Sequence, residues 1–224
     1  MSKTYLITGA VGNLGKSVTS KLTSEGHQVI GTVRSIKSNE ESSVDYRACD
    51  LTDEIATKDL FDSLKASYEH IDGVVMLVGG FGMSNLLTST SNDLNKMLNL
   101  NLMTAYHTAK YAAEWMHNNG GTKLIFVGAK PAIAGGSEVL PYAISKNAVM
   151  HLAQIINEDP NLKNIQASVI IPSIIDTPVN REFMPDANFK DWVSPEEIAE
   201  NISYLLSEQA NPLRDTVLKL YNNT

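Results

Sequence analysis

The alternation of short apolar runs with helical patterns constrains this chain more than any other feature. Most of the runs are continuously hydrophobic, which is typical of strands buried on both faces of a parallel sheet. The predicted strands are Lys3–Thr8, Gln28–Val33, Val44–Ala48, Gly73–Val78, Lys123–Val127, Gln166–Ile171 and Thr216–Tyr221. The helical patterns between them are Asn13–Glu25, Asp53–Tyr68, Asn92–Met116, Tyr142–Asn157 and Pro195–Ser207.

Strands that alternate with helices predict a doubly wound, Rossmann-like α/β sheet. The 224 residues show no internal repeat or linker, so we expect a single domain over residues 1–224. Asp53 and Ser194 are the expected helix caps, with Pro195 in the first helical turn. Ligands of such sheets bind beyond the carboxyl ends of the strands. The irregular stretch around 178–194 is the expected substrate loop.

Composition argues against several functional classes. The net charge is -7 and no long run of like charges occurs, so nothing predicts a nucleic-acid partner. The single cysteine, Cys49, excludes an internal disulfide and fits a reducing cytoplasm. The longest apolar run, Val74–Met83, is too short to span a membrane, so we expect a soluble cytoplasmic protein. The five histidines lack ligand spacing, and no metal site is expected.

A glycine-rich turn, Thr8-Gly9-Ala10-Val11-Gly12-Asn13-Leu14-Gly15, joins the first strand to the first helix. Glycines let the backbone approach a pyrophosphate, and the helix amino end offers free N–H groups. The motif predicts a dinucleotide site, and the alternative is a tight turn whose glycines serve packing only. The expected contacts come from Gly9, Gly12, Asn13, Leu14 and Gly15.

Two further strand ends support a dinucleotide site. Asp50-Leu51 follows the third strand, where the carboxylate can accept a hydrogen bond from an adenine amino group. Gly79-Gly80 follows the fourth strand, where the missing side chains leave room for a ribose and a pyrophosphate. Each of these pairs, taken alone, is more often a helix cap or a turn.

The second strand ends in Val33-Arg34, where an NAD site usually has an acidic residue. Arg34 can pair with a 2′-phosphate instead, so we favour NADP over NAD as the cofactor. The alternative is a solvated surface arginine, and Glu40 and Glu41 nearby reduce the local positive charge.

Tyr142 and Lys146 are four residues apart, which places both on one face of a helix. We expect the lysine to lower the pKa of the phenol, so that Tyr142 donates a proton to a developing anion. Lys146 can also hold the cofactor ribose. Tyr106 and Lys110 have the same spacing, but they lie inside a long helical pattern away from a strand end and are interpreted as structural.

In their order along nearly the whole chain, these motifs resemble the short-chain dehydrogenase/reductase family. The resemblance implies that Asn101 helps to hold a proton-relay water beside Lys146, and that Pro172 and Thr177 contact the nicotinamide. The alternative for Asn101 is a helix residue that bonds a neighbouring backbone group. Because family members pair the helices here predicted at Asn92–Met116 and Tyr142–Asn157, the resemblance also implies a homodimer or homotetramer.

The chain departs from the family at Ala129, where a catalytic serine usually stands 13 residues before the tyrosine. In this respect it resembles the dihydropteridine reductase branch, which has a similar Gly128-Ala129-Lys130 and a stretch similar to 176–192. Those enzymes favour NADH through an acidic residue after the second strand. Since that residue is missing here, the resemblance does not supply the cofactor preference.

The predicted reaction is hydride transfer to a small conjugated imine or carbonyl, with a quinonoid dihydropteridine as the leading substrate. Four residues are predicted to form an apolar lid over a flat substrate, with surface packing as the alternative: Phe81, Phe183, Met184 and Trp192. A general ketone or aldehyde reductase is the second candidate. A non-catalytic NADP sensor is a third, suggested by Ala129 and opposed by the intact Tyr142, Lys146 and Asn101.

Overall fold

The computed structural model describes residues 2–36, 43–120 and 123–224. A parallel seven-stranded sheet in the order β3-β2-β1-β4-β5-β6-β7 lies at its centre, so the predicted doubly wound fold is confirmed. The strands are β1 (Thr4–Thr8), β2 (Gln28–Val33), β3 (Val44–Ala48), β4 (Gly73–Met76), β5 (Lys123–Val127), β6 (Gln166–Pro172) and β7 (Val217–Leu220).

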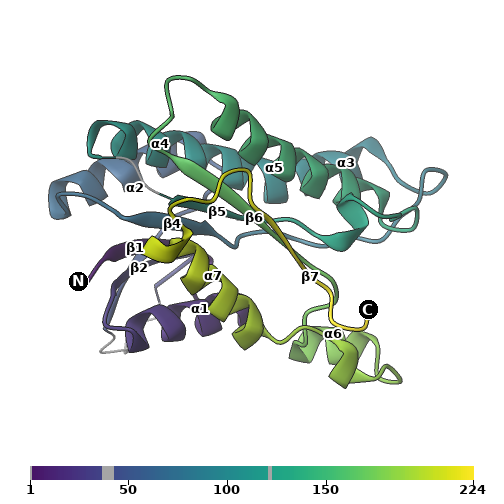
Figure 1. Ribbon diagram of the computed structural model, residues 1–224. Coiled ribbons are helices and arrows are strands. Elements are labelled where there is room, and N and C mark those ends of the chain that lie inside the picture. Colours follow the sequence, from purple (N-terminus) through teal and green to yellow (C-terminus); the bar gives the residue numbers. More distant parts are fainter. Residues whose placement is uncertain (1, 37–42, 121–122) are drawn as a thin grey trace.

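Helices cover both faces of the sheet (Figure 1). One face carries α1 (Asn13–Ser24) and α7 (Pro195–Leu206), and the other carries α2 (Glu54–Ser67), α4 (Thr104–Asn118) and α5 (Leu140–Glu158). Two shorter helices, α3 (Ser91–Met97) and α6 (Pro178–Phe183), lie at the end where the loops after β4 and β6 project. The described residues also form three 3₁₀ turns, at Lys130–Ala132, Phe189–Asp191 and Glu208–Ala210.

Each helical layer packs on its own hydrophobic core. Phe61, Met116 and Phe126 are fully buried between the sheet and α2, α4 and α5. Leu22 and Ile202 pack against the opposite face. Every residue of β5 and β6 is buried, which explains why their sequences are mostly apolar. β7 alternates between exposed and half-buried residues, as an edge strand should.

The predicted helix Asn92–Met116 is wrong in one respect, because it is not a regular α-helix. A π-helical segment, Leu98–Met103, separates α3 from α4. Such a segment widens one turn without interrupting the apolar pattern, so hydrophobic periodicity does not reveal it. Asn101 lies in this segment and is buried.

Other boundaries differ for local reasons. β4 ends at Met76 rather than Val78, because the amide of Leu77 donates a hydrogen bond to Thr8 Oγ1, at 2.9 Å, instead of extending the ladder. The predicted caps are confirmed: Asp53 accepts hydrogen bonds from two amides of α2, and Ser194 forms a capping box with Glu197 at α7. In the described ranges no helix combines the length and the apolar character that a membrane span requires.

Candidate active site

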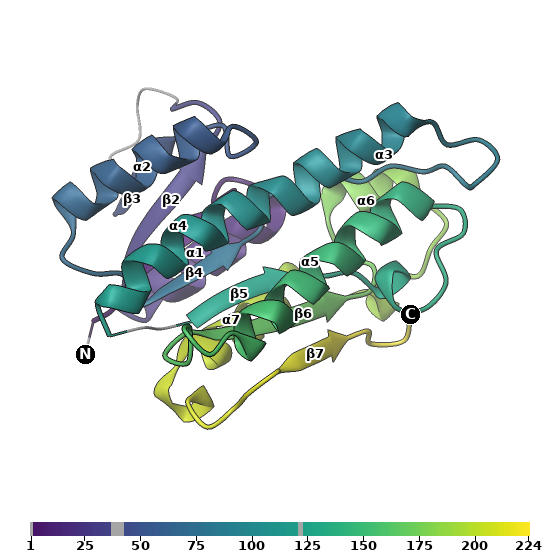
Figure 2. The same ribbon diagram turned by 90° about the horizontal axis from the view of Figure 1, so that it is seen from above.

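The predicted site residues gather at the carboxyl ends of the strands. Figure 2 shows β5, β6 and β7 pointing toward the end of the molecule where α3 and α6 lie. Because all seven strands are parallel, the turns that follow β1, β3, β4, β5 and β6 open at this same end.

The turn after β1 can be built only with glycine at two positions. Gly9 has a φ of +68°, a left-handed conformation that residues with a Cβ rarely adopt. A Cβ on Gly15 would collide with the Gly9 carbonyl oxygen and with the backbone of Ala10. These contacts pack the first turn of α1 tightly against the end of β1, as the dinucleotide motif requires.

The amino end of α1 is open to an anion. Its N-cap is Gly12, so no side chain caps the first-turn amides, and Asn13 beside it is exposed. Free N–H groups together with the positive end of the helix dipole suit a pyrophosphate. The residues present therefore fit a dinucleotide cofactor at this position.

Asp50 and Arg34 lie near one another at the ends of β3 and β2. Asp50 is exposed, and hydrogen bonds from the hydroxyl and the amide of Thr52, with a smaller contribution from the Arg34 charge, lower the pKa of its carboxyl. Arg34 is exposed, whereas Val33 and Leu51 are buried. Glu40 and Glu41 lie outside the described residues.

Tyr142 and Lys146 lie in the first two turns of α5. The Lys146 ammonium donates a hydrogen bond to the carbonyl of Val127, at 2.9 Å, and burial lowers its pKa to about 8. Burial raises the pKa of the Tyr142 phenol to about 12. The expected lowering of this pKa by Lys146 is therefore wrong, because desolvation of the phenolate prevails and the ammonium is bonded to Val127.

Asn101 fastens the cofactor side of the site to the catalytic helix. Its amide nitrogen donates to the Gly80 carbonyl at 3.1 Å and to Ser145 Oγ at 2.9 Å, and its Oδ1 accepts from the Gly80 amide at 2.8 Å. A Cβ on Gly79 would lie 2.5 Å from that Oδ1, so a side chain there would displace the Asn101 amide from its bonds to Gly80. Asn101 therefore bonds a neighbouring backbone group, which was the alternative role. Its role in holding a proton-relay water stays a prediction.

Ser145 is a connecting residue that the sequence analysis missed. It is fully buried, and its hydroxyl donates to the carbonyl of Tyr142 at 2.8 Å while it accepts from Asn101. The only local indication of this role in the sequence is that Ser145 directly precedes Lys146. In the other Tyr–Lys pair, the Lys110 ammonium of α4 donates to Glu54 of α2 at 2.5 Å and Tyr106 is 41% exposed.

The substrate side begins at Ala129, which is buried just before the 3₁₀ turn Lys130–Ala132. Its methyl group offers no hydrogen-bond donor. Pro172 is the buried last residue of β6. Thr177 is buried at the amino end of α6, where its hydroxyl accepts from the amide of Asn180 at 3.3 Å.

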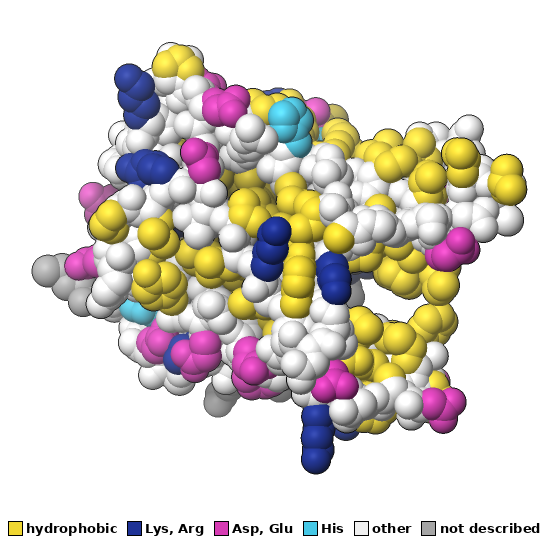
Figure 3. Space-filling model, turned by 45° about the vertical axis from the view of Figure 1, so that its right-hand side comes forward, with side chains coloured by type: hydrophobic (Ala, Val, Ile, Leu, Met, Phe, Trp, Pro, Cys, Tyr) yellow, Lys and Arg dark blue, Asp and Glu magenta, His cyan; other side chains and the backbone are white. Residues whose placement is uncertain are grey.

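The four predicted lid residues differ in exposure. Phe81 is 59% exposed and packs edge-on against the Tyr142 ring, with 5.0 Å between centroids, and Phe183 on α6 is 62% exposed. Figure 3 shows hydrophobic side chains on the two lobes that carry α3 and α6, with a hollow between them. Met184 is half-buried. Trp192 is buried and its ring packs against Phe189, so it contributes to the packing inside the loop.

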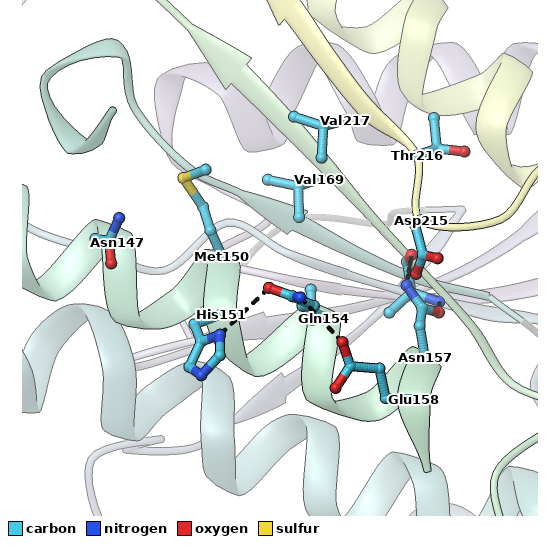
Figure 4. A pocket seen from close by; sticks show the side chains of 12 residues that line it. Asn147, Met150, His151, Gln154, Asn157, Glu158, Val169, Asp215, Thr216 and Val217 are labelled. Carbon is cyan, nitrogen blue, oxygen red and sulfur yellow. Dashed lines mark hydrogen bonds between the residues drawn. The ribbon is translucent and has the colours of Figure 1, made fainter. Parts of the chain in front are cut away.

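A surface groove of about 610 Å³ lies elsewhere, between α5 and β7 (Figure 4). Its polar side chains bond one another: His151 contacts Gln154, and Gln154 donates to Glu158 at 2.9 Å. Among the described residues that line it there is no predicted site residue, so this groove is separate from the candidate active site.

Comparison with known proteins identifies the family. Residues 3–188 match the family model of the short chain dehydrogenases. The chain is 29% identical to the 3-oxoacyl-[acyl-carrier-protein] reductase MabA of Mycobacterium tuberculosis, over 97% of this chain and 91% of that protein. It is 27% identical to the dihydropteridine reductase of Dictyostelium discoideum, over 98% of this chain and 94% of that one.

The fold is shared with solved structures as well. The structure of ElxO with NADP bound superposes with a TM-score of 0.89 at 21% identity, covering 98% of this chain and 97% of that one. Three findings agree on the family. The first strand ends in a glycine cradle, the helix after the fifth strand carries a Tyr–Lys pair, and the family model matches most of the chain. The chain belongs to the short-chain dehydrogenase/reductase family and is an NAD(P)-dependent oxidoreductase.

Proposed function

We propose that this enzyme transfers a hydride from NADPH to a small conjugated imine or carbonyl compound, with a quinonoid dihydropteridine as the leading substrate. The observation that carries the proposal is the placement of Tyr142 beside Phe81, on a helix that Asn101 and Ser145 fasten to the cofactor strand end. Bound nicotinamide cofactor supplies the hydride.

Tyr142 is the proposed proton donor. Because its pKa is raised to about 12, the phenol keeps its proton at neutral pH and can pass it to the substrate atom that becomes negative. Lys146, whose pKa is about 8, stays charged below that pH. A positive charge one helical turn away offsets part of the cost of burying the phenolate that remains, and the same ammonium can hold the cofactor ribose.

The substrate class is proposed from the buried methyl group of Ala129. A ketone reduced here has Tyr142 as its main side-chain donor, and loss of one preorganised donor lowers rates by about 10²–10³ in a comparable site. A quinonoid dihydropterin regains a stable conjugated ring on reduction, so it depends less on that donor. The similarity to a dihydropteridine reductase over nearly the whole chain supports the same substrate.

A substrate panel tests this proposal. NADPH oxidation is followed with quinonoid dihydropterin and with simple ketones, for the wild type and for Ala129→Ser. We expect good turnover of the pterin and poor turnover of ketones, and the variant should gain more on ketones. Strong turnover of unactivated ketones with none of the pterin would contradict the pterin proposal and favour a general carbonyl reductase. Tight NADPH binding without any turnover would favour a sensor.

The proposed preference for NADP rests on Val33 and Arg34. Val33 removes the acidic side chain that would repel a 2′-phosphate, and the exposed Arg34 guanidinium can bond that phosphate. Arg34→Ala should weaken NADPH binding about tenfold or more, as for loss of a charge-assisted hydrogen bond, and leave NADH little changed. Fluorescence titration measures both affinities, with Arg214→Ala as the matched control. Equal losses for both cofactors would show that Arg34 does not bind the phosphate.

A further inference from the structure

The last four residues, Tyr221–Thr224, form a C-terminal tail that contacts three loops of the substrate side. Figure 1 places the C-terminus beside α6, at the end of the molecule where these loops lie. Asn222 has a φ of +47°, a left-handed conformation that asparagine tolerates better than most residues. The chain turns there after β7 and runs along the substrate loop instead of away from it.

The tail contacts the end of the substrate loop through Asn222 and Asn223. The amide nitrogen of the Asn222 side chain donates to the Trp192 carbonyl at 2.9 Å. The backbone amide of Asn223 donates to the Asp191 carbonyl at 3.3 Å, and its side chain donates to Asp191 Oδ1 at 3.2 Å. Two neighbouring tail residues therefore bond two neighbouring loop residues.

Further contacts of the tail reach Glu197 of α7, at 3.5 Å from the Asn222 amide nitrogen, and the loops after β6 and β5. Ser173 follows Pro172, and its hydroxyl donates to the Tyr221 carbonyl at 3.0 Å and contacts Thr224 Oγ1 at 2.5 Å. Lys130 follows Ala129, and its ammonium lies over the Tyr221 ring, 5.0 Å from the centroid. The tail thus joins the segment beside Ala129, the turn at Pro172 and the substrate loop to one another.

The substrate loop has an internal framework that the tail connects to the sheet. At its base, the backbone amide of Asp176 donates to the Val193 carbonyl at 2.8 Å, and the amide of Val193 donates to the Ile174 carbonyl at 3.0 Å. Arg181 forms a two-point ion pair with Asp176 and lies over the Phe189 ring. These bonds hold the loop together, whereas the asparagines of the tail bond its Asp191–Trp192 end to residues that follow the edge strand β7.

We propose that Asn222 and Asn223 are positioning residues that set the place of the substrate loop over the site. They act through Asp191 and Trp192 and do not touch the substrate. The inference rests on the proposed function in one respect, that loop 178–194 binds the substrate. Asn222 and Asn223 bond Asp191 and Trp192. The expected pyrophosphate, adenine and ribose contacts lie instead after β1, β2, β3 and β4 and at Lys146, so the tail should affect substrate binding more than cofactor binding.

Introduction of a charge, followed by rescue, tests the proposal. Asn223→Asp places a carboxylate against Asp191 Oδ1, where the native side chain donates a hydrogen bond. We expect KM for the substrate to rise about tenfold, the effect of losing one or two hydrogen bonds, with a smaller change in the NADPH dissociation constant. Adding Asp191→Asn restores a donor to this contact and leaves an acceptor for Asn188, so KM should return toward the wild-type value. Asn118→Asp, an exposed asparagine on α4, is the matched control.

Hydrogen exchange gives a readout that needs no substrate. Amides of segment 186–194 should exchange faster in Asn223→Asp than in the wild type, and slow again in the double variant. Unchanged exchange in this segment, an unchanged KM, or a KM that the second substitution fails to restore would overturn the proposal. Tail-dependent exchange in an enzyme that reduces no member of the substrate panel would support the tail contact and count against the proposed function alone.

Discussion

Burial acts in opposite directions on the protonation of the two catalytic candidates. Removing a charge from water favours the neutral form, so the pKa of Tyr142 rises to about 12 while that of Lys146 falls to about 8. At neutral pH the phenol is protonated and the ammonium is still charged. The pair is therefore poised to give a proton, and the lysine is the member that titrates near physiological pH.

Replacement of Tyr142 by Phe removes the proposed proton donor and keeps the ring that packs against Phe81. We expect kcat to fall by about 10²–10⁴, the usual contribution of a general acid, while NADPH still binds. Steady-state kinetics and cofactor titration measure the two effects. Tyr106→Phe on α4 is the matched control and should stay near normal. The reverse behaviour of the two variants would show that the wrong pair was chosen.

The Lys146 pKa predicts a pH dependence. Since the folded-state pKa is lowered to about 8, Lys146 is charged below pH 8 and loses its proton as the pH rises through that value. The kcat/KM for reduction should therefore decline above about pH 8. The pKa of Lys123 is also lowered to about 8, but this residue lies at the other end of β5. Lys123→Met should keep the decline, and a profile that stays level to pH 9.5 would contradict the assignment.

At the scale of elements, α2 owes its start to one side chain. Asp53 Oδ1 accepts hydrogen bonds from the amides of Ile55 and Ala56, at 2.8 and 3.1 Å. Asp53→Ala removes both acceptors and should lower the free energy of unfolding by about 1 kcal/mol. Asp53→Asn keeps a cap of equal preference and is the matched control. Urea denaturation measures both, and equal midpoints for Asp53→Ala and the wild type would exclude the cap as a stabilising contact.

The elements that could be predicted from the sequence are those with a strong local signal. β5 and β6 are buried on both faces, so every residue of Lys123–Val127 had to be compatible with burial. The caps Asp53 and Ser194 depend only on the next three residues. The π-helical turn at Asn101 depends instead on bonds to Gly80 and Ser145, which are distant in sequence. No local pattern encodes those bonds.

The candidate site divides in the same way. The glycine turn and the Tyr142–Lys146 pair are recognisable because short segments carry the chemistry. The direction of the Tyr142 pKa shift could not be predicted, since it depends on how much protein surrounds the phenol. The contact between Asn222 and Trp192 could not be predicted either, because the two residues are 30 positions apart and meet only through the path of the tail.

At the scale of the whole molecule, α5 leaves apolar side chains uncovered. Ile144 is 44% exposed and Ile155 is 50% exposed, on the helix that also carries the catalytic pair. On neighbouring α4, Tyr106 is 41% exposed. Apolar residues on two adjacent helices are the kind of surface that a second copy of a chain covers in a symmetric dimer.

We therefore expect at least a homodimer, packed through α4 and α5. Ile155→Glu should shift the protein toward monomer, because it would place two carboxylates in a two-fold apolar contact. Ile55→Glu, on α2, is the matched control: Ile55 is 73% exposed and lies outside the expected interface. Light scattering at micromolar concentration measures the mass. A monomeric wild type would refute the assembly.

The place of β7 at the end of the sheet has a consequence for synthesis of the chain. Each residue of β6 is buried, and β7 is the last strand to leave the ribosome. Until Val217–Leu220 emerges, β6 is a largely apolar strand with one unpaired edge, the type of surface that recruits strands from other chains. β7 is short, its exposure alternates along the strand, and it pairs with that edge. A nascent chain interrupted before residue 217 would thus be prone to aggregate, although it already contains every residue of the proposed catalytic machinery.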